Sequence, residues 1–542
     1  MNQSIFSYRR GQQLLFVLLL LVHTVASYYY ISQQNITYDE PQYIEYAKRW
    51  LHGKPDRVVP LDDSKSPVVA VCWIPRIVRQ IINPHYKLTD YGRKDQAEGR
   101  YMMILFSFLA AFYVYKWCWD MYGAKGWWLP LILLLFDPLY LAYSTLITTD
   151  LACGAFLVAL LYHYRKYLLT GCRRQFMMAA CYTGIAIVTK QTLLFVVLFL
   201  PIITIVYYWN EKKSKLNRYA FAKAIIFMLI VLLVINISFY FSNTFIPFGK
   251  YAFESKTLND LQDGLPYLHW MPVPFPKAYV QSIDLIKAHA ELGAGKVEST
   301  YSGVYLFGQL NVNGGYWYYY IVTFFFKMPI GILLLLCFGV VLFLGNCKQH
   351  FRNKTYLFVL LPIVFYGIIL SFFNNFQTGI RHLLVIYPLI YIGLGKVLYE
   401  VCKMKLSYKI ATAALILYSF ISVVLYYPFI IPYTNELVAN KKKVYKIMMD
   451  SSVDYGQSDS SVNKYMIDHP EYNQPSSEPT KGKFAIPMGH IVNTRLQDKN
   501  PYLWYQNMNP TGLYRNVILL YDIKQQDLIN AGYTTDKKGI VF

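Results

Sequence analysis

Charged residues are scarce in this sequence, and acidic ones are the scarcest. Only 15% of the 542 residues are charged, whereas 55% are hydrophobic. This balance excludes an ordinary soluble protein of this length. The 31 acidic residues are outnumbered by 52 lysines and arginines. The basic residues occur in short loops between apolar runs and form no basic and aromatic surface motif, so no nucleic-acid partner is expected.

Cysteine is also scarce, and its pattern excludes a disulfide framework. By the topology given below, only Cys72 of the eight cysteines lies in an outer loop. The other seven fall in predicted spans or inner loops. No spacing of cysteine and histidine resembles a zinc site, and no internal repeat of solenoid period is visible. We therefore expect neither structural disulfides nor a structural zinc ion.

Long apolar runs are what the sequence does contain. The first, from Leu14 to about Ile31, follows Arg9 and Arg10. It is long for a signal peptide and lacks a clear A-x-A exit, so an uncleaved helix is favoured over a cleaved leader. Ten further runs have about the 17–25 residues that a membrane crossing requires. They lie near 101–119, 127–144, 150–165, 176–190, 192–208, 222–242, 321–345, 355–373, 380–399 and 409–432.

The basic loops predict the orientation of these spans. If the amino terminus is cytoplasmic, the inner loops are those near 165–174, 212–218, 348–354 and 403–409, and these carry the lysines and arginines. The sequence thus predicts an all-α polytopic membrane domain, residues 1–432, with about eleven transmembrane helices. Two outer loops are predicted, at 32–100 and at 243–320. Within the first, Gln42–Leu51 suits a helix in the membrane interface. Residues 433–542 are less apolar, and runs such as Phe484–Met488 and Asn516–Tyr521 predict a small α/β extracytoplasmic domain.

This topology gathers the candidate catalytic and binding residues on the outer rim. An ionisable residue at membrane depth is a functional candidate by default. The acidic candidates are Asp39, Glu40 and Asp150, and the cationic candidates are Lys65, Lys190, Lys327, Arg381 and His382. Carboxylates can take a proton from an attacking hydroxyl, and cations can hold a phosphate and stabilise it as a leaving group. Beside an apolar groove for a lipid tail, these groups predict an enzyme that acts on a lipid phosphate.

Each candidate also has a structural interpretation. Rim lysines and arginines commonly extend toward lipid headgroups. Asp150 follows two threonines and could cap a helix, and Asp39-Glu40-Pro41 could begin the interfacial helix. The coincidence of these residues on one face favours function over any single structural reading. The acidic pair could hold a divalent cation. A lipid substrate with a single phosphate does not demand one, so no metal ligand is assigned.

A series of short motifs in order along residues 30–460 resembles a known class of enzymes. The series comprises Asp39-Glu40, Lys65-Ser66-Pro67, Thr148-Thr149-Asp150, Gly184–Lys190, Lys327-Met328-Pro329, Arg381-His382-Leu383-Leu384 with Tyr387-Pro388, and Asp454-Tyr455-Gly456-Gln457. It looks like the GT-C membrane glycosyltransferases. Within that class it is most similar to the branch of protein O-mannosyltransferases and aminoarabinose transferases. The first loop has Lys-Ser-Pro where the aminoarabinose branch has a Lys-Pro pair, and the inserted repeat domain of the mannosyltransferase branch is absent.

The resemblance implies a function. An inverting glycosyltransferase would move a sugar from a polyprenyl-phosphate donor to a lipid, glycan or protein acceptor, at the periplasmic face of a bacterial inner membrane or an equivalent lumen. It implies that Asp39 is the base, that Asp150 positions the acceptor or the base, and that Lys65, Lys190 and Arg381 contact the phosphate. A transporter or flippase for lipid-linked glycans is a second interpretation, although the charges lie at one rim and not at the midplane. An oligosaccharide polymerase or ligase is a third.

Overall fold

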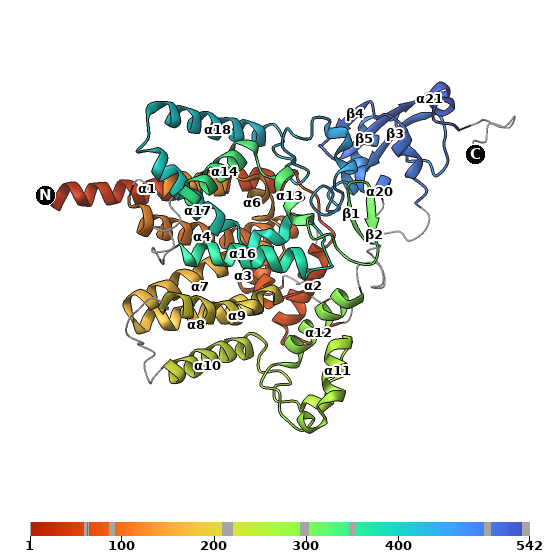
Figure 1. Ribbon diagram of the computed structural model, residues 1–542. Helices are drawn as coiled ribbons and strands as arrows, with labels where there is room; N and C mark the ends of the chain where they lie inside the picture. Colours follow the sequence, from red (N-terminus) through yellow and green to blue (C-terminus); the bar gives the residue numbers. More distant parts are fainter. Residues whose placement is uncertain are drawn as a thin grey trace.

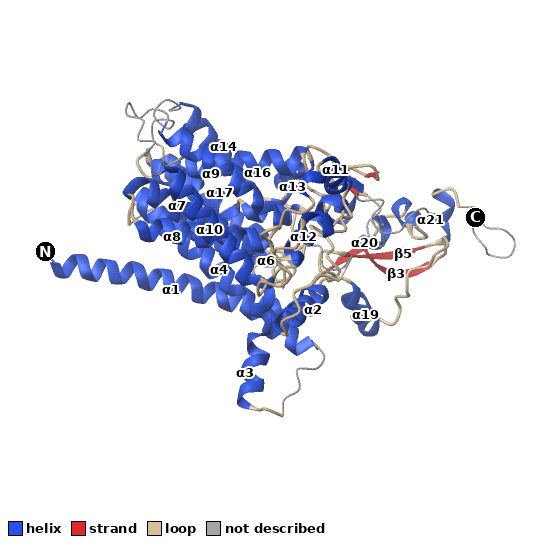
Figure 2. Ribbon diagram, turned by 90° about the horizontal axis from the view of Figure 1, so that it is seen from below, coloured by secondary structure: helices blue, strands red, loops and turns tan. Residues whose placement is uncertain are grey.

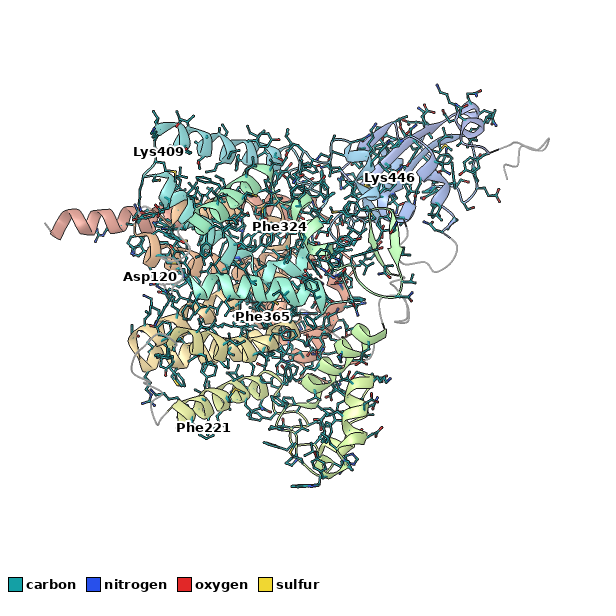
Figure 3. The ribbon with its side chains drawn as sticks, in the orientation of Figure 1. Asp120, Phe221, Phe324, Phe365, Lys409 and Lys446 are labelled. Atoms are coloured by element: carbon teal, nitrogen blue, oxygen red, sulfur yellow. The ribbon has the colours of Figure 1, made fainter. Side chains whose placement is uncertain are left out.

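The computed structural model shows a bundle of long helices with a small sheet-containing unit at one end (Figures 1 and 2). It describes residues 2–58, 62, 64–85, 93–124, 126–208, 220–292, 303–345, 354, 356–492 and 500–533. The predicted inner loop at 212–218 and most of that at 348–354 lie outside these residues. In Figure 3, Asp120 and Lys409 lie at one end of the bundle, and Lys446 lies in the unit at the other end.

The helices of the bundle follow the predicted apolar runs. They are α1 (Asn2–Gln33), α4 (Arg93–Tyr122), α5 (Trp128–Leu135), α6 (Pro138–Tyr143), α7 (Asp150–Thr170), α8 (Arg173–Thr189), α9 (Val196–Tyr208), α10 (Ala220–Ser238), α13 (Tyr319–Lys327), α14 (Ile330–Gly345), α16 (Leu357–Phe372), α17 (Tyr387–Val401) and α18 (Leu406–Val424).

Five helices of the described chain are long and apolar enough to cross a membrane by themselves. These are Arg10–Gln33, Gln96–Tyr122, Gln191–Tyr208, Phe221–Ser238 and Leu406–Val424. Helices α13 and α14, which meet at an angle of 120°, make a sixth if they form one broken span. Other predicted spans are interrupted: Asp137 accepts a hydrogen bond of 2.9 Å from Tyr140 N and so caps α6 directly after α5 ends. The chain is a helical membrane protein, and the count of eleven spans stays a prediction.

Helix α7 lies at the centre of the bundle and fixes the position of the outer rim. Residues 150–162 of α7 are all buried, and α7 packs against α4, α8 and the 3-10 helix η5 (Ile380–Val385). Gly154 permits the close approach to η5, since a Cβ atom there would lie 2.4 Å from the Leu384 carbonyl oxygen. The approach brings the first turn of α7, with Asp150, beside the start of η5, with Arg381.

The first outer loop forms short helices against the rim. Helix α2 (Glu40–Leu51) confirms the helix predicted at 42–51, but Tyr43, Ile44, Tyr46 and Ala47 are buried in protein and do not face lipid. Their partners include the 3-10 helix η1 (Pro67–Trp73). The exposed apolar surface of this loop is instead on α3 (Ile74–Ile82), where Ile81 and Ile82 are more than 70% exposed. Helix α3 projects from the side of the bundle in Figure 2.

Two further outer regions complete the fold. The second outer loop holds α11 (Lys256–Gly264), α12 (Lys277–Leu292) and a hairpin of β1 (Val304–Leu306) and β2 (Gln309–Asn311). The carboxyl-terminal unit holds an antiparallel sheet of order β3-β5-β4, with β3 (Gly482–Pro487), β4 (Gly512–Tyr514) and β5 (Ile518–Ile523). Helices α19 (Asp459–Asp468), α20 (Met488–Val492) and α21 (Gln525–Asn530) accompany it. Strands β3 and β5 confirm the two predicted strand-like runs, whereas the boundary at residue 433 stays a prediction.

Candidate active site

The centre of the candidate site is Arg381, which lies between the two predicted carboxylates. Arg381 Nη1 donates a hydrogen bond of 2.8 Å to Asp39 Oδ2 and lies 3.7 Å from Asp150 Oδ2. Asp150 Oδ1 accepts a hydrogen bond of 2.6 Å from Lys190 Nζ. Two acids and two cations thus alternate along one continuous chain of contacts. Asp39 is 30% exposed, whereas Asp150 is 2% exposed, so Asp39 is the carboxylate that an outside molecule can reach.

Local backbone structure places each of these residues. Asp39 ends the loop after α1 and precedes α2, and Asp150 begins α7. Lys190 follows the last residue of α8. Gly379 precedes η5 with a φ of 120°, and a Cβ atom there would lie 2.2 Å from Ser451 Oγ. A glycine is therefore needed at this position, because only glycine lets the start of η5 pack against Ser451 and so places Arg381 in the site.

A pocket opens beside this chain of contacts. This small hollow, about 270 Å³ with the open solvent at its mouth included, is lined by Asp150, Cys153, Lys190, Thr192, Tyr366, Leu370, Arg381, His382 and Val385. Asp150 Oδ2, Arg381 Nε and Tyr366 Oη have no hydrogen-bond partner among the described residues. Phe365, which Figure 3 labels, packs on Phe199 of α9 at a ring separation of 5.5 Å. The pocket itself combines apolar side chains, such as Leu370 and Val385, with polar atoms able to bind an incoming group.

The remaining predicted residues of the rim lie around this centre. His382 lines the pocket, and its Nε2 is 3.2 Å from Thr378 Oγ1. Lys65 is 3% exposed, and its ammonium group lies 4.3 Å from the centre of the Tyr43 ring. Burial raises the pKa of Asp39, but the charges of Arg381 and then Lys65 outweigh it and hold that pKa below its usual value. Asp39 is therefore ionised at neutral pH and able to accept a proton.

Glu40 is adjacent to Asp39 in sequence but faces the opposite way. Its carboxylate is fully buried and accepts hydrogen bonds from Arg100 Nε at 2.8 Å and Arg100 Nη2 at 2.6 Å. Thr37, Gln96 and the Ile147 amide also donate to it. Both oxygens of Glu40 are occupied by the scaffold, which ties α2 to α4 and to the turn before α7.

Lys327 is also bound within the protein. It is 4% exposed, and its ammonium group donates a 2.9 Å hydrogen bond to the Ile431 carbonyl oxygen and a second bond to that of Ser452. It is not among the residues that line the pocket. Lys327 thereby joins the break between α13 and α14 to the backbone at Ile431 and at Ser452.

The structure adds one residue that the sequence analysis did not select. Tyr455 Oη donates a hydrogen bond of 2.5 Å to Asp39 Oδ2 and accepts one from Arg381 Nη1. The Arg381 guanidinium also lies 4.6 Å from the centre of the Tyr455 ring. Tyr38 N donates to the Tyr455 carbonyl at 3.0 Å, which joins this segment to the Asp39 loop. The available signal was the motif Asp454-Tyr455-Gly456-Gln457, which resembled the family but carried no assigned role.

The cations of this site suit a bound phosphate, and its exposed carboxylate suits a proton acceptor. In the part of the chain that the structure describes, no three His, Cys, Asp or Glu side chains are arranged to hold a metal. Arg381 and Lys190 are permanent or strong cations at the pocket wall, and arginine binds phosphate oxygens in pairs. Asp39 is the ionised, partly exposed base candidate beside them.

Part of the chain matches the model of a known protein family. Residues 73–237, which include Asp150 and Lys190, match the family model described as dolichyl-phosphate-mannose-protein mannosyltransferase. This match confirms the predicted resemblance to the protein O-mannosyltransferase branch, and the matched family is one of membrane glycosyltransferases, as predicted. No curated protein matches the sequence.

Two solved structures resemble the fold. The first is ArnT from Cupriavidus metallidurans in the apo state, with 12% identity and a TM-score of 0.43 over 72% of this chain and 60% of that chain. The second is the same protein bound to undecaprenyl phosphate, with 10% identity and a TM-score of 0.44 over 93% of this chain and 97% of that chain.

Proposed function

We propose that this protein is an inverting glycosyltransferase that moves a sugar from a polyprenyl-phosphate donor to an acceptor hydroxyl at the outer face of the membrane. The observation that carries the proposal is Arg381, which contacts both Asp39 and Asp150 at the wall of a pocket that also contains Lys190. The family match over residues 73–237 supports the polyprenyl-phosphate class of donor.

In the proposed reaction, the donor phosphate binds in the pocket beside Arg381 and Lys190. Arg381 Nε, which has no partner among the described residues, and the Lys190 ammonium supply donors for the phosphate oxygens. Lys65, whose charge acts on Asp39, adds to the positive field, and His382 lines the pocket as a neutral hydrogen-bonding ring. The polyprenyl tail leaves the pocket between the helices into lipid, past the apolar wall formed by residues such as Leu370 and Val385.

The bond changes then follow from the position of Asp39. The Asp39 carboxylate takes the proton of the acceptor hydroxyl as the hydroxyl oxygen forms a bond to the anomeric carbon. The bond between that carbon and the phosphate oxygen breaks, and its electron pair leaves with the polyprenyl phosphate. Arg381 and Lys190 stabilise the charge that develops on the leaving phosphate. A single displacement of this kind inverts the anomeric centre.

The other acidic and basic residues of the rim have supporting parts in this proposal. Asp150 orients Lys190 and Arg381 through its two oxygens. Tyr455 holds Asp39 and Arg381 relative to each other. Glu40 and Lys327, which the sequence placed among the candidates, are assigned to the scaffold because their polar atoms are bound by Arg100 and by backbone carbonyls.

We further propose the arrangement of the chain in the membrane. Eleven spans, with the amino terminus in the cytoplasm, would put the site and the carboxyl-terminal unit on the periplasmic side of a bacterial inner membrane. The acceptor is a lipid, a glycan or a protein hydroxyl that reaches Asp39. A flippase for lipid-linked glycans is the alternative, and it requires no proton acceptor beside the phosphate site.

Donor binding tests the proposal without knowledge of the sugar. Purified wild-type protein in detergent is titrated with undecaprenyl phosphate, and binding is followed by the rise in thermal stability. Arg381→Ala should weaken binding by about ten- to a hundredfold, since a hydrogen bond to a charged group contributes about 1.5–3 kcal/mol. Arg79→Ala is the matched control, because Arg79 is 45% exposed and pairs with Glu98 on the surface. Equal affinity of all three proteins would contradict the phosphate site.

A further inference from the structure

The outer end of α10 presents aromatic side chains on an unusual backbone. Tyr240, Phe241 and Phe245 have φ angles of 56°, 53° and 65°, and their side chains are 47%, 53% and 61% exposed. The left-handed region is uncommon for residues other than glycine, and bulky residues there are held by their surroundings. Here the conformation turns three rings outward, toward the exterior of the protein.

A second segment adds its rings to the same surface. The Phe245 amide donates to the Val273 carbonyl and the Val273 amide to the Ile246 carbonyl, both at 3.0 Å. This pairing folds residues 240–273 into a loop that we call the aromatic hairpin, and α11 lies within it (Figure 1). Its returning limb carries Tyr267 at 64% exposure and Trp270 at 76%. The hairpin therefore exposes five aromatic rings, those of Tyr240, Phe241, Phe245, Tyr267 and Trp270.

The base of the hairpin is fixed to the bundle by specific contacts. The Tyr240 ring stacks on Trp50 of α2 at 5.1 Å, and Trp50 Nε1 donates to the Ser238 carbonyl at 2.8 Å. Thr244 Oγ1 donates to Asn236 Oδ1 at 2.8 Å, and Asn236 Nδ2 donates to the Pro274 carbonyl at 3.0 Å. These contacts hold the left-handed residues in place, so the outward direction of the rings is built into the fold.

The apolar residues next to the aromatic hairpin indicate that it contacts a lipid surface. Helix α10 is one of the five apolar helices long enough to cross a membrane, and its exposed face includes Phe221, Leu229, Leu233 and Ile237. Figure 3 labels Phe221 at the opposite end of α10 from the hairpin. The apolar face of α10 continues at its outer end into the aromatic hairpin. Tyrosine and tryptophan are enriched where apolar spans meet the headgroups, and an exposed apolar patch of this kind marks an interaction surface.

We propose that the aromatic hairpin is a membrane-binding element that rests at the boundary between phospholipid headgroups and acyl chains, with Trp270 inserted. The element also bears on the candidate site. The hairpin leads into α12, whose Ser282 accepts a hydrogen bond from Gln191. Gln191 adjoins Thr192, which lines the pocket. The hairpin is therefore connected, through α12 and its Ser282, to one edge of the pocket.

Fluorescence quenching in vesicles tests this proposal independently of any enzyme activity. The full-length protein is reconstituted into phosphatidylcholine vesicles with and without acyl chains brominated near the glycerol. The chain has ten tryptophans, so the signal of Trp270 is obtained as the difference between wild type and Trp270→Phe. We expect the brominated lipid to remove more than half of the Trp270 signal. We expect aqueous iodide to quench the Trp270 signal several-fold less than the signal of the control variant Ile529→Trp.

The control variant places a tryptophan on an exposed surface of the carboxyl-terminal unit. Ile529→Trp, made in the Trp270→Phe background, substitutes a residue of α21 that is 52% exposed. Its signal should be quenched by iodide and not by brominated lipid. A Trp270 signal that responds to both quenchers as the Ile529→Trp signal does would overturn the proposal. So would protection of Trp270 from iodide without quenching by brominated lipid, because that pattern indicates cover by protein or glycan.

Discussion

Arg381 Nη1 donates a hydrogen bond of 2.8 Å to Asp39 Oδ2, which joins residues that lie 342 positions apart in the sequence. The proposed phosphate ligand and the proposed base are thus ion partners before any donor is bound. A phosphate that binds Arg381 competes with Asp39 for the guanidinium, and it leaves the carboxylate freer to accept a proton. Donor binding and base strength are coupled through this one contact.

The coupling predicts a pH effect of Arg381→Gln. Arg381 and Lys65 hold the pKa of Asp39 below its usual value of about 3.9. Asp39 is the active base when ionised, so wild-type kcat/KM falls only when the pH drops below that value. Without Arg381, burial dominates and the pKa rises, so the acid limb of the kcat/KM profile shifts to higher pH. The profile of Arg79→Gln should match wild type; an unshifted limb in Arg381→Gln would contradict the role of Asp39 as base.

Tyr455→Phe tests the positioning role of Tyr455. The phenol hydroxyl donates to Asp39 and accepts from Arg381, and a hydrogen bond to a charged group contributes about 1.5–3 kcal/mol. We expect kcat to fall by about tenfold or more, with a smaller change in the donor KM. Tyr514→Phe, in the carboxyl-terminal unit, removes a hydroxyl that contacts Arg515 and serves as the control. A purely structural Tyr455 would lower stability and leave kcat per folded enzyme unchanged.

Glu40→Gln should act on stability more than on chemistry. Glu40 and Arg100 are both about 1% exposed or less, and removal of one partner of a buried ion pair costs about 3–5 kcal/mol. We expect a large decrease in the free energy of unfolding of Glu40→Gln, visible as a lower Tm in detergent. Asp39→Asn, at a site that is 30% exposed, should retain a Tm near that of wild type. A Glu40→Gln protein that is as stable as wild type but inactive would contradict this assignment and indicate that Glu40 takes part in catalysis.

The orientation of the chain in the membrane can be measured by labelling cysteines in intact cells with a thiol reagent that does not cross the membrane. Cysteines introduced at Ser64 and at the exposed Ser460 should be labelled from outside in the proposed topology. Native Cys172 directly precedes α8 and native Cys402 directly follows α17; both are exposed and should be labelled only after permeabilisation. Protection of Ser64→Cys or Ser460→Cys, or labelling of Cys172 in intact cells, would contradict the topology.

The sequence predicted the helices of the bundle and the gathering of ionisable residues because apolar runs and rim charges are local signals. It could not separate Asp39 from Glu40, since two adjacent residues at the start of a helix point to different sides and only packing shows that Arg100 binds one of them. Nor could the sequence separate Lys327 from Lys190, since both are lysines at predicted ends of spans on the outer rim. The break between α13 and α14 turns Lys327 toward the Ile431 and Ser452 carbonyls. Tyr455 was missed because its position depends on a contact between distant segments, not on hydropathy.

The transfer reaction itself tests the central claim most directly. Membranes from a strain that lacks this protein supply the unmodified acceptor, and purified protein is added with labelled polyprenyl-phosphate sugars, one at a time. The account predicts that wild type and Arg79→Ala convert one such donor to polyprenyl phosphate and move its label to the membrane acceptor. Asp39→Asn should lower the initial rate by about 10²–10⁴-fold while it still binds the donor. Transfer by Asp39→Asn at the wild-type rate would contradict the account.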